Sequence, residues 1–205
     1  MILVRDLTLP PFDVGEALRY AGVRGAGSVD ELALLARVYN ELEGGLCAKV
    51  VYTVLPVTAV DGGVRLGPIE CPSRELATRL FGCENAVLFV ATVGREPDRL
   101  IRKYSAVSPA SALFASAVGS ERVEGLCDAF CEAFVKENLT RGGTITERFS
   151  PGYGDLPLEM QTNVFKILSP SVRIGVSLGE GMIMSPSKSV SAIFGIRTEV
   201  KANEA

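Results

Sequence analysis

The sequence contains no histidine among its 205 residues, and this absence excludes several kinds of chemistry. Ser-His and Cys-His nucleophilic pairs, zinc sites with histidine ligands and histidine proton relays all need an imidazole. The chain also cannot supply a histidine ligand to the cobalt of a corrinoid. We therefore predict no catalytic residue of these classes and no metal site in this chain.

An excess of positive charge and long apolar runs are also lacking. Lys and Arg total 21 against 24 Asp and Glu, which gives a net charge of -3, and no basic cluster indicates a nucleic-acid partner. No apolar run approaches the ~18 residues needed to cross a bilayer. Residues 1–6 do not have the layout of a signal peptide. We expect no membrane partner and a cytoplasmic location.

The five cysteines are an odd number in a chain without a secretory segment, which favours free thiols over disulfides. Cys127 and Cys131 lie one helical turn apart on the apolar face of a predicted helix. No further Cys or His motif completes a metal site around them. We interpret them as buried thiols.

The hydrophobic pattern, with 47% hydrophobic residues, predicts one globular domain of alternating strands and helices. Helices are predicted at 12–20, 29–43, 73–81, 95–104, 108–137 with a bend at Gly119, and 158–168. Strands are predicted at 2–5, 48–60, 64–69, 86–93, 144–148, 172–178 and 190–197. In the last strand, Val190, Ala192, Phe194 and Ile196 alternate with Ser189, Ser191 and Gly195. Residues 200–205 are predicted to be frayed.

The stretch Arg148 to Pro157, with the sequence R-F-S-P-G-Y-G-D-L-P, has the composition of a ligand-binding loop. The Arg148 guanidinium suits a carboxylate or phosphate bidentately. Gly152 and Gly154 allow backbone amides to approach a ligand, and Tyr153 offers a flat face. The alternative is a turn between a strand and a helix, with Asp155 as the N-cap of that helix.

This loop, followed by Ser185-Pro-Ser-Lys-Ser-Val-Ser-Ala192, resembles the activation domain of vitamin B12-dependent methionine synthase. The likeness is to the free-standing form of that domain, and it covers roughly residues 108–196. It implies an α+β fold, a twisted and mostly antiparallel sheet with packed helices. It also implies one activation-type domain over 1–205, in which 106–200 bind S-adenosylmethionine (SAM) and 1–105 form an N-terminal part.

The resemblance also implies a SAM site. Arg148 would hold the amino-acid carboxylate, Asp128, in a C-D-A-F context, would face the ammonium, and Tyr153 would lie against the adenosine. The full set of implied SAM-binding residues is Arg148, Phe149, Ser150, Gly152, Tyr153 and Asp128.

The implied function is a reactivation subunit that presents SAM for the reductive methylation of oxidised cob(II)alamin. The cobalamin would be carried in trans by a separate methionine synthase core, and a flavodoxin-type protein would donate the electron. Whether such an accessory subunit is itself an enzyme stays open. The alternatives are a SAM-binding interaction module and a reactivase for another corrinoid methyltransferase.

Two further SAM-dependent classes fit the residues poorly. A free-standing small-molecule methyltransferase would need a glycine-rich loop after its first strand. A radical SAM enzyme would need a third cysteine in C-x-x-x-C-x-x-C, and none follows Cys131 at that spacing.

Overall fold

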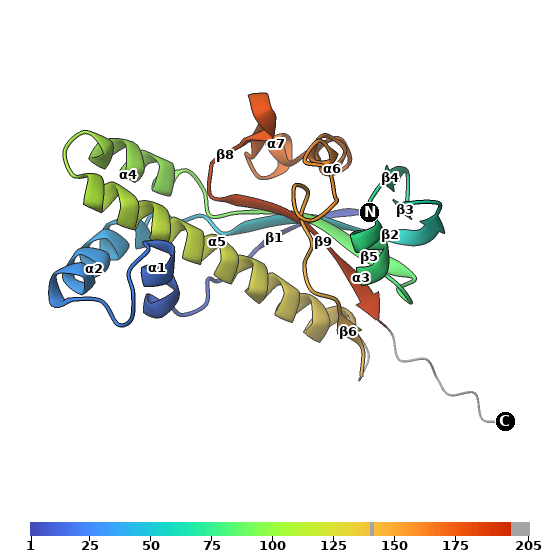
Figure 1. Cartoon of the computed structure of the whole chain (residues 1–205), viewed down its shortest axis with the longest axis horizontal. Coiled ribbons are helices and arrows are strands. Elements are labelled where there is room, and N and C mark those ends of the chain that lie inside the picture. The colour runs from blue at the N-terminus through green and yellow to red at the C-terminus, as the bar shows by residue number, and fades with distance from the viewer. Residues whose placement is uncertain (140–141, 198–205) are drawn as a thin grey trace.

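A computed structural model describes residues 1–139 and 142–197. It shows one seven-stranded sheet with helices packed on both faces (Figure 1). The strands are β1 (Ile2–Asp6), β2 (Lys49–Val60), β3 (Gly63–Leu66), β4 (Ile69–Cys71), β5 (Asn85–Thr92), β6 (Thr144–Ile145), β7 (Ser177–Leu178), β8 (Met184–Ser185) and β9 (Ser189–Arg197). The helices are α1 (Val14–Tyr20), α2 (Val29–Glu43), α3 (Arg74–Arg79), α4 (Glu96–Ser105), α5 (Pro109–Asn138), α6 (Met160–Leu168) and α7 (Pro170–Arg173), with a 3-10 turn η1 (Glu180–Met182).

The sheet has the strand order β4-β3-β2-β5-β9-β6, and β1 pairs with the first half of β2. Every described strand pair is antiparallel. The strands predicted at 48–60 and from residue 64 pair as a hairpin, with Val60 opposite Gly63 across the turn. The predicted α+β class with a mostly antiparallel sheet is therefore confirmed. In the part of the chain that the structure describes, no helix is both long and apolar enough to cross a membrane.

The long helix α5 covers one face of the sheet. Ser108 caps it by accepting a hydrogen bond from the Ser111 amide, and Pro109 occupies its first turn. Its second half packs Leu126, Phe130 and other apolar residues on the strands. The helix continues without interruption through Gly119, where a Cβ would lie 2.8 Å from the Lys188 side chain.

The other face of the sheet is covered by α3 and α6. Leu76 and Leu80 from the α3 region, with Met160 and Val164 from α6, lie in one core cluster with Ile193 of β9. The predicted alternation of β9 is thus confirmed, because Ala192 and Phe194 belong to the cluster under α5. A third cluster joins α1, α2, α4 and the first half of α5.

Arg122 anchors the N-terminal segment to α5. Its side chain is 2% exposed and forms an ion pair with Glu121. It also donates to the carbonyl oxygens of Pro10, at 2.8 Å, and Pro11, at 3.1 Å. Such a buried charge is tolerated because it is both paired and hydrogen-bonded.

Three predicted strands are wrong in part. The strand predicted at 64–69 is divided into β3 and the start of β4, which pair with each other across a turn where Gly67 has a positive φ. Residues 172–178 begin as α7, because Ser169 adopts a left-handed conformation and Pro170 starts a new helical turn; only Ser177–Leu178 are extended. The strand predicted at 144–148 ends after Ile145. There the Thr146 hydroxyl accepts a hydrogen bond from the Gly195 amide, at 2.9 Å, which interrupts the regular backbone pairing, and the chain stays beside β9 as far as Phe149. The residues predicted to be frayed, 200–205, lie outside the described residues.

Candidate functional site

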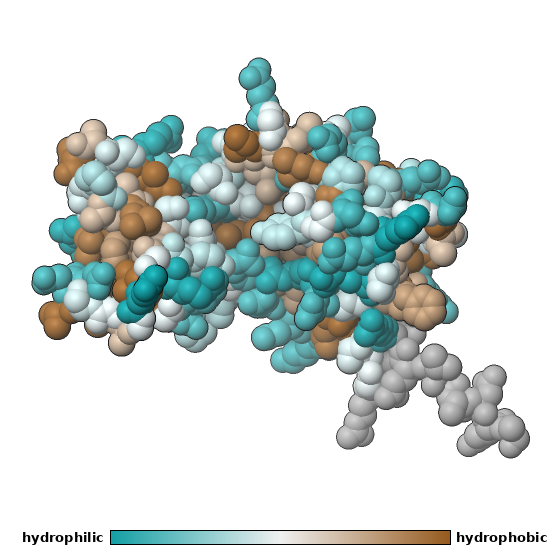
Figure 2. All heavy atoms as spheres, in the orientation of Figure 1, coloured by the Kyte–Doolittle hydropathy of each residue, from teal (hydrophilic) through white to brown (hydrophobic). Residues whose placement is uncertain are grey.

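A cleft of about 630 Å³ opens between the second half of α5, helix α3 and the segment 145–154. Hydrophilic side chains gather over this part of the molecule (Figure 2). The segment is held on β9 by the end of β6 and by a bridge further along, in which Phe149 and Ile193 exchange two backbone hydrogen bonds of 2.8 and 2.9 Å. Residues on either side of this bridge therefore point into the cleft from a fixed backbone.

Arg148 lies on one wall of the cleft between two carboxylates of α5. Its guanidinium is 2.8 Å from Asp128 Oδ1 and 3.1 Å from Glu124 Oε2. The Arg148 side chain is 24% exposed, whereas those of Glu124 and Asp128 are 39% and 66% exposed. Burial opposes the charge on Arg148, but the acidic groups beside it raise its pKa above the usual value. The cluster of Arg148, Glu124 and Asp128 is therefore open to solvent on the side of its two carboxylates.

Arg79 of α3 lies on the opposite wall and was missed by sequence reasoning. Its guanidinium donates to Glu75 and to Glu147, each at 3.1 Å, and its centre lies 4.8 Å from the middle of the Phe149 ring. Its buried Nε has no hydrogen-bond partner among the described residues. The i, i+4 spacing of Glu75 and Arg79 indicates a helix pair, but nothing in the sequence connects it to a loop seventy residues away.

Five of the six candidate residues line the cleft: Asp128, Arg148, Phe149, Ser150 and Tyr153. Gly152 lies outside the lining. It has a φ of +91°, and its amide donates to the Leu156 carbonyl at 2.9 Å, so it turns the loop and its N–H is already engaged. Gly154 lies on the wall instead, where a Cβ would be 2.0 Å from Glu75 Oε2.

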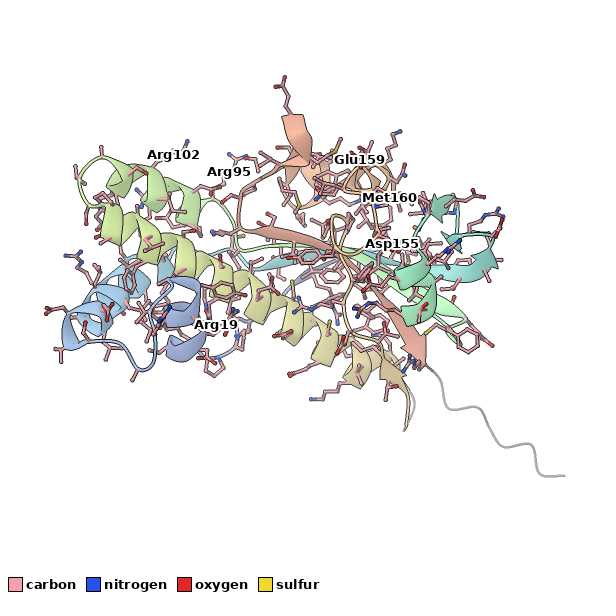
Figure 3. The ribbon with its side chains drawn as sticks, in the orientation of Figure 1. Arg19, Arg95, Arg102, Asp155, Glu159 and Met160 are labelled. Atoms are coloured by element: carbon pink, nitrogen blue, oxygen red, sulfur yellow. The ribbon has the colours of Figure 1, made fainter. Side chains whose placement is uncertain are left out.

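Asp155 does not cap the helix that follows it, which corrects one prediction. Helix α6 begins at Met160 with Glu159 before it. The Asp155 carboxylate instead accepts from the Ser73 hydroxyl and from the Arg74 amide, at 2.8 Å, at the start of α3. Figure 3 shows Asp155 close to α3. The loop is thus tied to the opposite wall of its own cleft.

The residues of the second motif, at 185–192, mostly make contacts within the fold. The Ser187 amide donates to Asp98 at 2.8 Å, and the Ser189 hydroxyl bonds Thr92 and the Pro186 carbonyl. From this motif only Val190 reaches the cleft wall.

One thiol, that of Cys131, lies on the cleft wall. Burial raises the pKa of the Cys131 thiol to about 11. It is therefore protonated at neutral pH and is no nucleophile there. Burial also raises the pKa of Cys127, which lies fully inside the core. All five cysteines are free, as predicted.

The fold matches a solved structure described as the crystal structure of the MetH reactivation domain bound to AdoHcy. The likeness has a TM-score of 0.73 at 15% sequence identity, and it covers 98% of this chain and 80% of that chain. No model of a protein family matches the sequence, and no curated protein is significantly similar to it. The shared fold extends over the first hundred residues, where the sequence carries no motif of the resemblance.

Proposed function

We propose that this chain binds SAM in the cleft between α5, α3 and the 145–154 segment, and that it acts as a reactivation subunit for a cobalamin-dependent methionine synthase. The observation that carries the proposal is the position of Arg148, between two half-exposed carboxylates at the wall of a cleft of small-molecule size. The likeness of the fold to a domain crystallised with AdoHcy supports it.

The ion pair of Arg148 and Asp128 carries one positive and one negative charge, as the amino-acid end of SAM does. A guanidinium that already holds a carboxylate at 2.8 Å can exchange it for another carboxylate of the same geometry. Asp128, 66% exposed, is then free to accept hydrogen bonds from an ammonium group. Glu124 stays beside Arg148 and keeps the guanidinium oriented. The wall therefore suits a zwitterion.

The remaining lining residues suit the adenosine. Tyr153 is 69% exposed at the rim and offers a flat aromatic face. Phe149 is buried beneath the Arg79 guanidinium and closes the floor of the cleft. The Arg79 guanidinium lines the opposite wall and is oriented by Glu75 and Glu147. Gly152 contributes to this site by turning the loop.

The ligand-binding part is not confined to residues 106–200 in this proposal. Glu75 and Arg79 come from the first half of the chain and form one wall of the cleft. Since the fold likeness also covers nearly the whole chain, we propose that residues 1–205 work as a single activation-type domain.

The reaction itself requires a partner. SAM supplies a methyl group on a sulfonium, whose in-line transfer needs orientation and no general base when the acceptor is a reduced cobalt. The chain has no histidine to hold a corrinoid. We propose that a separate methionine synthase core carries the cobalamin and that a flavodoxin-type protein supplies the electron. Arg148 and Asp128 would hold the amino-acid end so that the methyl faces the open side of the cleft.

Two experiments test the two halves of the proposal. Isothermal titration calorimetry of the chain with SAM should show one binding site; absence of binding would refute the SAM site. The chain is then added to a methionine synthase core that lacks its own activation domain and is trapped in the Co(II) state, with a reduced flavodoxin-type donor and SAM. Recovery of turnover is expected. Binding without recovery would refute the reactivation role alone.

A further inference from the structure

We propose that the cleft selects the positively charged methyl donor over its neutral demethylated product by means of its net charge. This rests on the proposed SAM site and deepens it. The feature that points to it is the set of charged residues on the two walls. These are Glu75, Arg79, Glu124, Asp128, Glu147 and Arg148.

The walls carry an excess of negative charge. Four carboxylates and two guanidiniums leave a net charge of -2 at neutral pH. No lysine is among the lining residues. The neighbouring surface adds to this field, because the adjoining hollow is lined by Asp13, Glu16, Glu121 and Glu132 besides Glu124 and Asp128 and by no lysine.

The excess of -2 is what remains after both guanidiniums are counted, and each of them contacts two carboxylates. Arg148 lies between Glu124 and Asp128, and Arg79 lies between Glu75 and Glu147. The Glu147 side chain is 89% exposed. The sulfonium of SAM, a positive charge additional to the ligand's ammonium, therefore gains attraction from both walls. A neutral thioether in the same place gains none.

SAM and S-adenosylhomocysteine share their adenosine, carboxylate and ammonium groups and differ by the methyl group and its sulfonium charge. The contacts of Arg148 and Asp128 are common to both ligands and cancel in a comparison. Two excess charges at about 6 Å with water-like screening correspond to a preference of about tenfold for the sulfonium. Transfer of the methyl group would remove that preference, so the product would leave more readily than the donor.

The test is calorimetry at low salt with three ligands: SAM, S-adenosylhomocysteine and sinefungin, in which a carbon carrying a protonated amine replaces the methylated sulfonium. We expect SAM and sinefungin to bind about tenfold more tightly than S-adenosylhomocysteine. The ratio should fall towards one in about 1 M salt, where charges are screened within about 3 Å. Sinefungin separates the charge from contacts of the methyl group itself.

A variant identifies the source of the charge. Glu147→Gln removes one of the two excess charges and should reduce the preference for SAM by about threefold. Asp30→Asn removes an exposed carboxylate of α2, at the far end of the molecule from α3 in Figure 1, and should leave the preference unchanged. Thermal unfolding establishes that both variants fold.

Equal affinities for SAM and S-adenosylhomocysteine in the unmodified chain would overturn this inference and leave the SAM site standing. So would a tenfold preference that neither salt nor Glu147→Gln reduces. If none of the three ligands binds, the SAM site fails, and the inference fails with it.

Discussion

The carboxylate of Asp155 caps a helix that begins eighty residues earlier in the chain, after Ser73. It accepts from the Ser73 hydroxyl and from the Arg74 amide at 2.8 Å, with longer contacts of 3.3 and 3.4 Å from the Glu75 amide. Helix α3 in turn presents Glu75 and Arg79 to the cleft. This carboxylate therefore ties the loop to helix α3, beside the Arg79–Glu147 pair that joins the same two segments.

The Asp155 contact predicts an acid-dependent loss of stability. The hydrogen bonds from Ser73 and the amides lower the pKa of Asp155 below its usual value. A lowered folded-state pKa means that Asp155 stabilises the fold above about pH 3.9, the unfolded-state value, and that this contribution is lost as pH falls through the folded-state pKa. Asp155→Asn should be less stable than the unmodified chain at pH 7, and the difference should shrink below about pH 4.

Urea unfolding at pH 7, 5 and 3 measures that difference. Asp61→Asn, in the turn between β2 and β3, controls for the loss of one surface carboxylate. A difference for Asp155→Asn that is absent at pH 7, or that grows in acid, would contradict the capping role.

Removal of the Arg148 guanidinium should weaken SAM binding. Arg148→Ala deletes the partner of the ligand carboxylate, which corresponds to about 1.5 to 3 kcal/mol for a charge-assisted hydrogen bond. Arg65→Ala removes an exposed guanidinium paired with Glu70 on the hairpin and should leave affinity unchanged. Calorimetry compares the two. An Arg148→Ala protein that is folded and binds SAM with full affinity would exclude this side chain from the site.

Asp128 and Glu132 provide a matched pair on α5. Asp128 contacts Arg148 and lines the cleft, whereas Glu132, one turn further on, is exposed and does not line it. We expect Asp128→Asn to weaken SAM binding by about 1 kcal/mol, through loss of the ammonium partner. Glu132→Gln should change it by much less. Equal effects of both substitutions in calorimetry would mean that Asp128 acts only through overall charge.

Gly154 and Gly62 separate backbone strain from contact with the cleft wall. Both have positive φ, +54° and +73°, so alanine at either position should cost about 1 to 2 kcal/mol of unfolding free energy. A Cβ at Gly154 would also lie 2.0 Å from Glu75 Oε2, whereas one at Gly62 would meet nothing within 4 Å. Gly154→Ala should therefore displace Glu75 from Arg79 and alter SAM binding.

The measurements are denaturant unfolding and SAM titration of both alanine variants. Gly62→Ala should lose stability and keep its affinity for SAM. If Gly154→Ala behaves in the same way, Glu75 has no part in shaping the cleft.

Much of the fold was accessible from local sequence signals. The helices predicted at 29–43, 73–81 and 108–137 are present, and Ser28, Ser73 and Ser108 cap them through side-chain hydrogen bonds to nearby amides. The alternation in β9 correctly assigned its two faces. Where a contact between residues far apart in the sequence determined the structure, the prediction from local sequence was wrong. Thr146 replaces a backbone acceptor and ends β6 early.

The site was predictable only on one side. Asp128, Arg148 and Tyr153 could be grouped because the loop and the resemblance point to them. Arg79 could not, since its place beside Phe149 depends on how α3 docks against the loop. The same docking takes Asp155 away from the helix that follows it, where its residue type alone would have placed it.

The most direct test of the central claim is a crystal structure of the chain with SAM. The account predicts the ligand carboxylate on the Arg148 guanidinium in place of Asp128, the ammonium beside Asp128, and the adenosine against Tyr153. A structure in which Arg148 still holds Asp128 and Glu124, with SAM bound at another place or not at all, would contradict it.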